Sequence, residues 1–202
     1  MRMKIHGDLA SGNCLKVKYI ADYLGLSYRW IPVDIMQGES RKPDFLRINP
    51  MAQVPAVEFD DGRCLAQSNA ILRYLAQGSD LLPQEPYLQA KIDEMLFWEQ
   101  YSHEPYIAVC RFEMVYRGKS AAEREAWRVQ RGEAALDFMQ ERLSEGEYLV
   151  MDRFSIADIA LLAYTRLAPQ GGFDLGARGH IGRWIRRCEQ RLRLTASTPA
   201  AD

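Results

Sequence analysis

Side chains that can act on a thiol lie together between the first strand-like run and the first helix-like run. This segment reads Ser11-Gly12-Asn13-Cys14. The thiolate is the nucleophilic form of sulfur, and a helix N-terminus combined with a hydrogen-bond donor lowers the pKa of a thiol. Ser11 supplies a hydroxyl donor, and the amide of Asn13 can point at a sulfur or cap the helix. The segment therefore predicts a site that stabilises a thiolate.

Cys14 is a second candidate at the same junction, because it could itself be the nucleophile. It lies three residues before Val17 and seven before Ala21, on the helix face that should pack against a sheet. A buried cysteine usually behaves as a small apolar side chain. We therefore favour Ser11 as the functional residue and keep Cys14 as the alternative.

A third group of polar residues, Gln67-Ser68, begins a later helix-like run. Ser68 stands where a helix N-cap is expected, and the free N–H groups at a helix N-terminus suit a carboxylate. An ordinary helix cap would give the same pattern. The pair therefore predicts a cap and a candidate anion site.

The elements that position these residues form an α+β pattern in residues 1–77. Helix-like runs cover a segment with Val17, Ile20 and Leu24 on one face, then 43–48 and 68–76. Strand-like runs alternate with them at 4–6, 28–33, 56–59 and 64–66, and the last two are joined by the turn Asp60-Asp61-Gly62. The order β-α-β-α-β-β-α predicts a thioredoxin-like domain whose sheet changes from parallel to antiparallel.

The rest of the chain is predicted to be helical. Residues 78–86 are polar and contain a glycine and two prolines, which is typical of a linker. The domain 87–202 has helix-like runs at 87–116, 121–143, 156–166 and 179–192, and its small polar tail, 196–202, is expected to fray. Ser155 and Asp158 are spaced as a capping box at the start of the third run.

Three segments together resemble the cytosolic glutathione transferases over almost the whole chain: 11–18, 49–57 and 67–75. The resemblance is to serine-type members of the zeta and theta-like kind. It implies that residues 1–77 bind glutathione as co-substrate and that the all-α domain holds a second, electrophilic substrate. It also implies that Ser11 is the donor to the glutathione thiolate, with Asn13 as a possible second donor, and that the protein is a homodimer.

The resemblance further assigns residues that would bind glutathione. Asn49-Pro50-Met51-Ala52-Gln53-Val54-Pro55 is similar to the family's stretch that ends in a cis-proline, where the backbone of Val54 would pair with the tripeptide as an added strand. Ser68 would receive the γ-glutamyl carboxylate. Gln67 departs from the acid that the family usually has for the α-amino group, and a neutral amide gives up charge-assisted bonding. Arg41 is a candidate for the glycine carboxylate, because arginine binds carboxylates in a bidentate manner.

The second-substrate pocket is less defined by the sequence. In such folds it lies between the loop after the first strand, here Leu9 and Ala10, and the first long helix of the second domain. On that helix Tyr106, Arg111 and Met114 are candidates. Side chains of these types also serve as core or helix surface, so both interpretations stay open.

Charge and hydropathy argue against two other classes of protein, those that bind nucleic acid and those that span a membrane. A net charge of −1 gives no global attraction to nucleic acid, and no apolar run approaches the roughly 20 residues of a membrane span. Four scattered cysteines without a Cys-x-x-Cys pair, and no basic-then-apolar leader, favour a cytoplasmic protein.

The pair His103-Glu104 resembles the start of a zinc-protease helix motif. The second histidine of that motif is missing, because Ile107 stands in its place, so no metal site is expected. A thiol-disulfide oxidoreductase using Cys14 and a non-catalytic binding module remain the alternatives.

Overall fold

The computed structural model describes residues 3–195 and divides into two compact units, one ending at Leu82 and the other beginning at Pro83. This division falls inside the segment 78–86, where the sequence indicates a linker. The expectation for the tail, 196–202, lies outside the described residues.

The first unit is built on a four-stranded sheet with the order β2-β1-β3-β4. Its strands are β1 (Met3–Gly7), β2 (Tyr28–Pro32), β3 (Ala56–Phe59) and β4 (Cys64–Ala66). β1 runs parallel to β2 and antiparallel to β3, with Ile5 opposite both Trp30 and Val57, and β3 runs antiparallel to β4. The sheet thus has the predicted change from parallel to antiparallel pairing.

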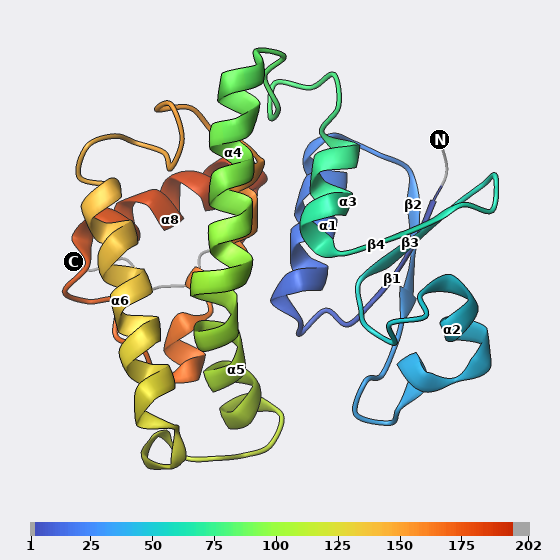
Figure 1. Cartoon of the computed structure of the whole chain (residues 1–202), viewed down its shortest axis with the longest axis horizontal. Helices are drawn as coiled ribbons and strands as arrows, with labels where there is room; N and C mark the ends of the chain where they lie inside the picture. The colour runs from blue at the N-terminus through green and yellow to red at the C-terminus, as the bar shows by residue number, and fades with distance from the viewer. Residues whose placement is uncertain (1–2, 196–202) are drawn as a thin grey trace. The chain divides into compact units, whose positions relative to one another are not determined.

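Helices cover both faces of this sheet, with α1 and α3 side by side on one face and α2 on the other (Figure 1). Their bounds are α1 (Gly12–Tyr23), α2 (Pro43–Ile48) and α3 (Ser68–Leu75), each close to its predicted range. α1 buries Val17 and Ile20 completely on its sheet-facing side. On the opposite face, Phe45 of α2 packs with Val33 and Ala56. The first unit has the predicted thioredoxin-like fold.

The second unit is helical throughout its regular elements. Its α-helices are α4 (Pro86–Trp98), α5 (Glu104–Val115), α6 (Ala126–Arg142), α7 (Ile156–Thr165) and α8 (Gly179–Leu192). Every residue of α7 is buried, which is expected of a helix that is apolar on all sides and occupies the middle of a helical domain. Trp184 of α8 is also fully buried and donates from Nε1 to Asp158 Oδ1 at 2.8 Å.

The predicted capping box at the start of α7 is confirmed. The Ser155 hydroxyl accepts from the N–H of Ala157 at 3.2 Å, and Asp158 Oδ2 accepts from the N–H of Ser155 at 3.0 Å. Asp158 Oδ1 also accepts from the N–H of Leu149 at 3.1 Å. This carboxyl group therefore joins the helix start, the preceding loop and α8.

Two predicted helix boundaries were wrong. The run 87–116 is not one α-helix, because a π-helical segment, Glu99–His103, separates α4 from α5 (Figure 1). Pro105 is the second residue of α5, and a proline has no N–H to continue the α-helical hydrogen bonds, which favours such an irregular turn. The run 121–143 begins instead with a 3-10 turn, Ala121–Glu123, capped by Ser120, and α6 starts only at Ala126.

Candidate functional site

Ser11 is the residue immediately before α1, and its hydroxyl does not cap that helix. Its backbone is extended, with φ −83° and ψ 122°, while its carbonyl accepts the N–H of Leu15 at 2.9 Å. Its side chain is partly buried. The structure thus leaves the Ser11 hydroxyl at the positive end of the helix dipole, where a donor to an anionic sulfur is most effective.

Cys14 lies on the buried face of α1, as the sequence predicts, and its side chain is fully buried. Burial raises the pKa of its thiol to about 11, although hydrogen bonds from the Asp8 N–H, at 3.4 Å, and from Ser11 act in the opposite direction. Because only the thiolate is a good nucleophile, a thiol that stays protonated at neutral pH is a poor one. The geometry therefore favours Ser11 over Cys14.

Gly7, at the end of β1, explains why Cys14 fits so close to the sheet. A Cβ atom on Gly7 would lie 3.0 Å from Cys14 Sγ and 3.1 Å from Cη2 of Trp30. Cys14 is fully buried, so a side chain at position 7 would press on the contact between α1 and the sheet. Glycine at this position thus allows β1 and α1 to approach closely.

The Val54–Pro55 peptide bond is cis, as expected from the resemblance. Within residues 3–195, neither the N–H nor the C=O of Val54 has a hydrogen-bond partner, although β3 begins only two residues later. Unpaired backbone groups beside a strand can bind an extended peptide by strand addition. The backbone of Val54 is therefore available to a peptide ligand.

Asn49 holds the loop before Val54 in place, a role that was not predicted from the sequence. It is 1% exposed, donates from Nδ2 to the carbonyl of Gln53 at 2.7 Å, and accepts the N–H of Met51 at Oδ1 at 3.1 Å. Asparagine before proline is a common turn signal, and this signal could have identified it. The side chain of Gln53 is exposed.

The predicted cap of α3 requires a correction. The N-cap is Gln67 and not Ser68, because Gln67 has φ 69°, outside the helical region, and Ser68 is already the first helical residue. Ser68 is 5% exposed, and its hydroxyl donates to Asn13 Oδ1 at 3.1 Å. The first turns of α1 and α3 are thereby joined, which the sequence did not indicate because the two residues are far apart along the chain.

Gln67 and Arg41 both present exposed side chains in the first unit. A positive φ is uncommon for a residue other than glycine and often accompanies a functional position. The amide of Gln67 makes only a long contact, 3.7 Å, to Met51 Sδ. Among the described residues, the guanidinium of Arg41 has no hydrogen-bond or ion-pair partner. Both side chains are thus accessible to a ligand.

The predicted second-substrate residues are distributed over both units. Leu9 is 52% exposed, and the N–H of Ala10 donates to Asp8 Oδ1 at 2.8 Å. Tyr106 is partly buried with its ring edge-on to Trp127. Arg111 is buried and donates from Nε to Gln170 Oε1 at 2.8 Å, so it contributes to packing in the helical unit.

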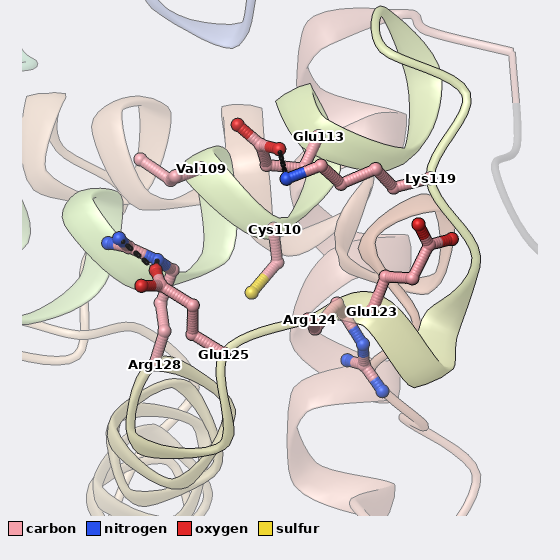
Figure 2. A pocket seen from close by; sticks show the side chains of 8 residues that line it. All are labelled: Val109, Cys110, Glu113, Lys119, Glu123, Arg124, Glu125 and Arg128. Atoms are coloured by element: carbon pink, nitrogen blue, oxygen red, sulfur yellow. Dashed lines mark hydrogen bonds and ion pairs between the residues drawn. The ribbon is translucent and has the colours of Figure 1, made fainter.

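The helical unit also contains a pocket of about 220 Å³ with a strongly charged lining. Figure 2 shows the Cys110 sulfur directed between the facing acidic and basic side chains of this pocket. Two of its basic groups pair with acidic ones, Arg128 with Glu125 at 2.6 Å and Lys119 with Glu113, and Arg124 donates to the carbonyls of Ala121, Gly171 and Gly172. Burial raises the pKa of the Cys110 thiol. The pocket includes none of the residues predicted from the sequence.

His103, considered above as part of a metal motif, is fully buried, with Nε2 3.0 Å from Thr165 Oγ1. Within residues 3–195, no three histidine, cysteine, aspartate or glutamate side chains are grouped so that they could hold a metal ion. In the same range, no helix combines the length and the apolar character needed to cross a membrane.

A thioredoxin-like domain with a hydroxyl at the start of α1, unpaired backbone beside a cis-proline, and a helical second domain define the class of a glutathione transferase. The family models for the glutathione S-transferase N-terminal and C-terminal domains match residues 2–77 and 95–191. Glutathione S-transferase 3 of Zea mays is 31% identical over an alignment of 194 positions that covers 90% of this chain and 86% of the maize protein.

Solved structures agree with this assignment. The glutathione S-transferase from Pseudomonas fluorescens is 46% identical with a TM-score of 0.92, covering 98% of this chain and 99% of that one. A possible glutathione S-transferase from Rhodopseudomonas palustris is 39% identical with a TM-score of 0.91 and the same coverage. The chain belongs to the glutathione S-transferase family. This membership supports glutathione conjugation as its activity and glutathione as its co-substrate.

Proposed function

We propose that this glutathione transferase is of the serine type, with the Ser11 hydroxyl as donor to the glutathione thiolate. The observation that carries the proposal is the contrast between two side chains at the start of α1, those of Ser11 and Cys14. The Ser11 hydroxyl is not used as a helix cap, whereas Cys14 is fully buried and its pKa is raised. A hydrogen bond to a thiolate stabilises the charged form and so lowers the pKa of the bound thiol.

The chemistry that follows is attack of the thiolate on a small electrophile. The glutathione S–H bond loses its proton to solvent, and the sulfur lone pair forms a bond to an electrophilic carbon. In a substitution the leaving group departs with the electron pair of its old bond, and in an addition a proton from solvent completes the product. Stabilising the thiolate before the electrophile arrives raises the fraction of reactive sulfur at neutral pH.

Glutathione would be held along the first unit by groups that are accessible there. The N–H and C=O of Val54 would pair with its backbone, next to Gln53 and Pro55, because they have no partner within the described residues. The N-terminus of α3 at Ser68 suits the γ-glutamyl carboxylate. Gln67 would face the α-amino group, and the guanidinium of Arg41 the glycine carboxylate.

We also propose that the protein is a cytoplasmic homodimer. Support for a dimer comes from α4 and the π-helical segment after it, where Tyr87, Phe97 and Tyr101 are 68%, 75% and 82% exposed. Their spacing places them within one face of a helix, and exposed aromatic patches of this kind commonly mark protein interfaces. Leu9, Ala10 and Tyr106 remain candidates for contact with the second substrate.

Steady-state kinetics with reduced glutathione and a chloronitrobenzene electrophile tests the catalytic assignment. Ser11→Ala should lower kcat/KM by about 10- to 100-fold, because a hydrogen bond to a charged group contributes roughly 1.5–3 kcal/mol. Ser144→Ala, which removes an exposed hydroxyl of the helical unit, is the matched control and should leave kcat/KM unchanged. A loss in Cys14→Ala as large as that in Ser11→Ala would contradict the proposal.

A further inference from the structure

The side chain of Asn49 binds two points of the loop that leads to Val54. Oδ1 accepts the N–H of Met51 at 3.1 Å, and Nδ2 donates to the carbonyl of Gln53 at 2.7 Å. Asn49 is 1% exposed, so water does not compete for these bonds. The backbone N–H of Asn49 also donates to the carbonyl of Phe45, in α2, at 2.9 Å. Asn49 therefore connects α2 to the loop through both its backbone and its side chain.

The conformation of this loop is not one that its own residues favour. Ala52 has φ 55°, in the left-handed region that residues with a Cβ atom rarely adopt. The N–H of Ala52 donates to the Asn49 carbonyl at 3.0 Å, which closes the turn. Ala52 also lies between Met51 and Gln53, the two residues whose backbone groups bind the Asn49 side chain. These hydrogen bonds offset the unfavourable φ, so the Asn49 side chain stabilises the path of the loop.

The bond to the Gln53 carbonyl has a direct consequence for the backbone of Val54. The Gln53 C=O and the Val54 N–H belong to the same peptide unit, and this unit is trans. A trans peptide is planar, and its C=O and N–H point in opposite directions. Because Asn49 Nδ2 holds the oxygen, the Val54 N–H is directed away from Asn49. The side chain of Val54 packs against the buried cluster that includes Phe45, which anchors the residue on its other side.

The N–H of Val54 is thus fixed in direction but has no hydrogen-bond partner within the described residues. An added strand exchanges two backbone hydrogen bonds with one residue only if its own paired residue has both an N–H and a C=O. In glutathione only the cysteine has both groups as amides, because the γ-glutamyl residue has a free amino group and the glycine has a carboxylate. The cysteine carbonyl is therefore the acceptor that the Val54 N–H fits.

We propose that Asn49 is a positioning residue that orients the Val54 N–H toward the cysteine carbonyl of glutathione. It acts through the Gln53–Val54 peptide unit and not by contact with the ligand. No proton is transferred, and no covalent bond is made or broken. The inference rests on the proposed pairing of Val54 with glutathione, and it adds a buried residue that sets the affinity for glutathione independently of the thiolate.

Isothermal titration calorimetry with S-methylglutathione tests this role. The ligand has no thiol, so its affinity does not depend on the chemistry proposed for Ser11. Asn49→Ala removes both side-chain bonds, whereas Asn49→Asp, as a carboxylate at pH 8, keeps the acceptor for Met51 and lacks the donor to Gln53. Both should raise Kd about two- to tenfold, the range for one neutral hydrogen bond. Gln77→Ala removes an exposed amide of the first unit that also donates to a carbonyl, and this control should leave Kd unchanged.

A second ligand separates positioning from a purely structural role. An analogue of S-methylglutathione with an alkene in place of the Cys–Gly amide keeps the planar shape but has no cysteine carbonyl. Both substitutions at Asn49 should leave the Kd of this analogue unchanged, with circular dichroism and thermal unfolding as checks on folding. Equal losses for both ligands, or a wild-type Kd for S-methylglutathione in either variant, would overturn the inference. A wild-type protein that binds both ligands equally tightly would instead overturn the proposed pairing at Val54 itself.

Discussion

The hydroxyl of Ser68 donates to Asn13 Oδ1 at 3.1 Å and joins the first turns of α1 and α3. These two helix N-termini carry the proposed thiolate donor and the proposed carboxylate site. The sequence indicated Asn13 as a possible second donor to the thiolate. In the structure its amide oxygen accepts the Ser68 hydroxyl, so the residue is well placed to orient Ser68. The predicted thiolate site and the predicted anion site are therefore linked by one side-chain contact.

Removal of this contact should weaken glutathione binding more than it changes the chemistry. Asn13→Ala leaves the Ser68 hydroxyl without its acceptor, and we expect the Kd of glutathione to rise about two- to tenfold, the range for one hydrogen bond. Isothermal titration calorimetry measures this directly. If Kd is unchanged while the pKa of the bound thiol rises, Asn13 acts on the sulfur as a second donor instead.

Gln67 offers a gain-of-affinity test. Gln67→Glu places a carboxylate where the proposal puts the α-ammonium of glutathione, and a charged pair adds roughly 1 kcal/mol over a neutral hydrogen bond. Glutathione should therefore bind about three- to tenfold more tightly. A glutathione analogue without the α-amino group is the control and should gain nothing from the substitution. Equal gains for both ligands would remove Gln67 from the amino-group site.

The capping box of α7 provides a stability prediction. Both oxygens of Asp158 accept buried N–H groups, Oδ2 from Ser155 and Oδ1 from Leu149 and Trp184. Asp158→Asn replaces one of these oxygens by an amide nitrogen, which cannot accept, so at least one of these donors loses its partner. A buried donor without a partner costs about 1–3 kcal/mol, so the midpoint of urea unfolding should fall. Glu145→Gln, which changes an exposed carboxylate in the same unit, should leave the midpoint unchanged.

The same carboxyl group predicts a pH dependence. Burial raises the pKa of Asp158 from 3.8 to about 6, even though hydrogen bonds from Trp184, Leu149 and Ser155 favour its charged form. Between these pH values the native state binds more protons at this group than the unfolded state, so its contribution to stability is complete below pH 3.8 and is lost as the pH rises through 6. The stability difference between wild type and Asp158→Asn should accordingly be larger at the acidic end. If the stability difference between wild type and Asp158→Asn instead increased from acidic to neutral pH, the raised pKa of Asp158 would be contradicted.

The proposed dimer can be tested at the exposed face of α4. Phe97→Glu puts a charge in the middle of this face and should convert the protein to monomers in sedimentation-velocity experiments, because burying an unpaired charge is unfavourable. Val115→Glu, at another exposed apolar position in the helical unit, is the control and should leave the assembly unchanged. A wild type that sediments as a monomer would exclude the dimer.

Much of the fold followed from local sequence pattern. Short apolar runs with turn residues between them identified β3, β4 and the hairpin that joins them, and the spacing of Ser155 and Asp158 identified the start of α7. The break between α4 and α5 was missed because residues 99–103 continue a helical pattern and only Pro105 marks the irregularity. Local pattern does not determine how such a break is accommodated.

Two local features near the candidate site were predicted from the sequence and are confirmed: the cis Val54–Pro55 bond and the burial of Cys14. The role of Ser11 stays a prediction. The contact between Ser68 and Asn13 depends on how α1 and α3 pack, and the role of Asn49 depends on the path of its loop. Such relationships arise from tertiary packing, which a single sequence does not specify.

The central claim is that Ser11 lowers the pKa of the glutathione thiol, and the most direct measurement is a pH titration of the thiolate absorbance of bound glutathione. For wild type we expect a pKa clearly below that of free thiols, which is about 8.5. For Ser11→Ala, at saturating glutathione, we expect the pKa to rise by about one to two units, the equivalent of one charge-assisted hydrogen bond. The same pKa in both proteins would contradict the account.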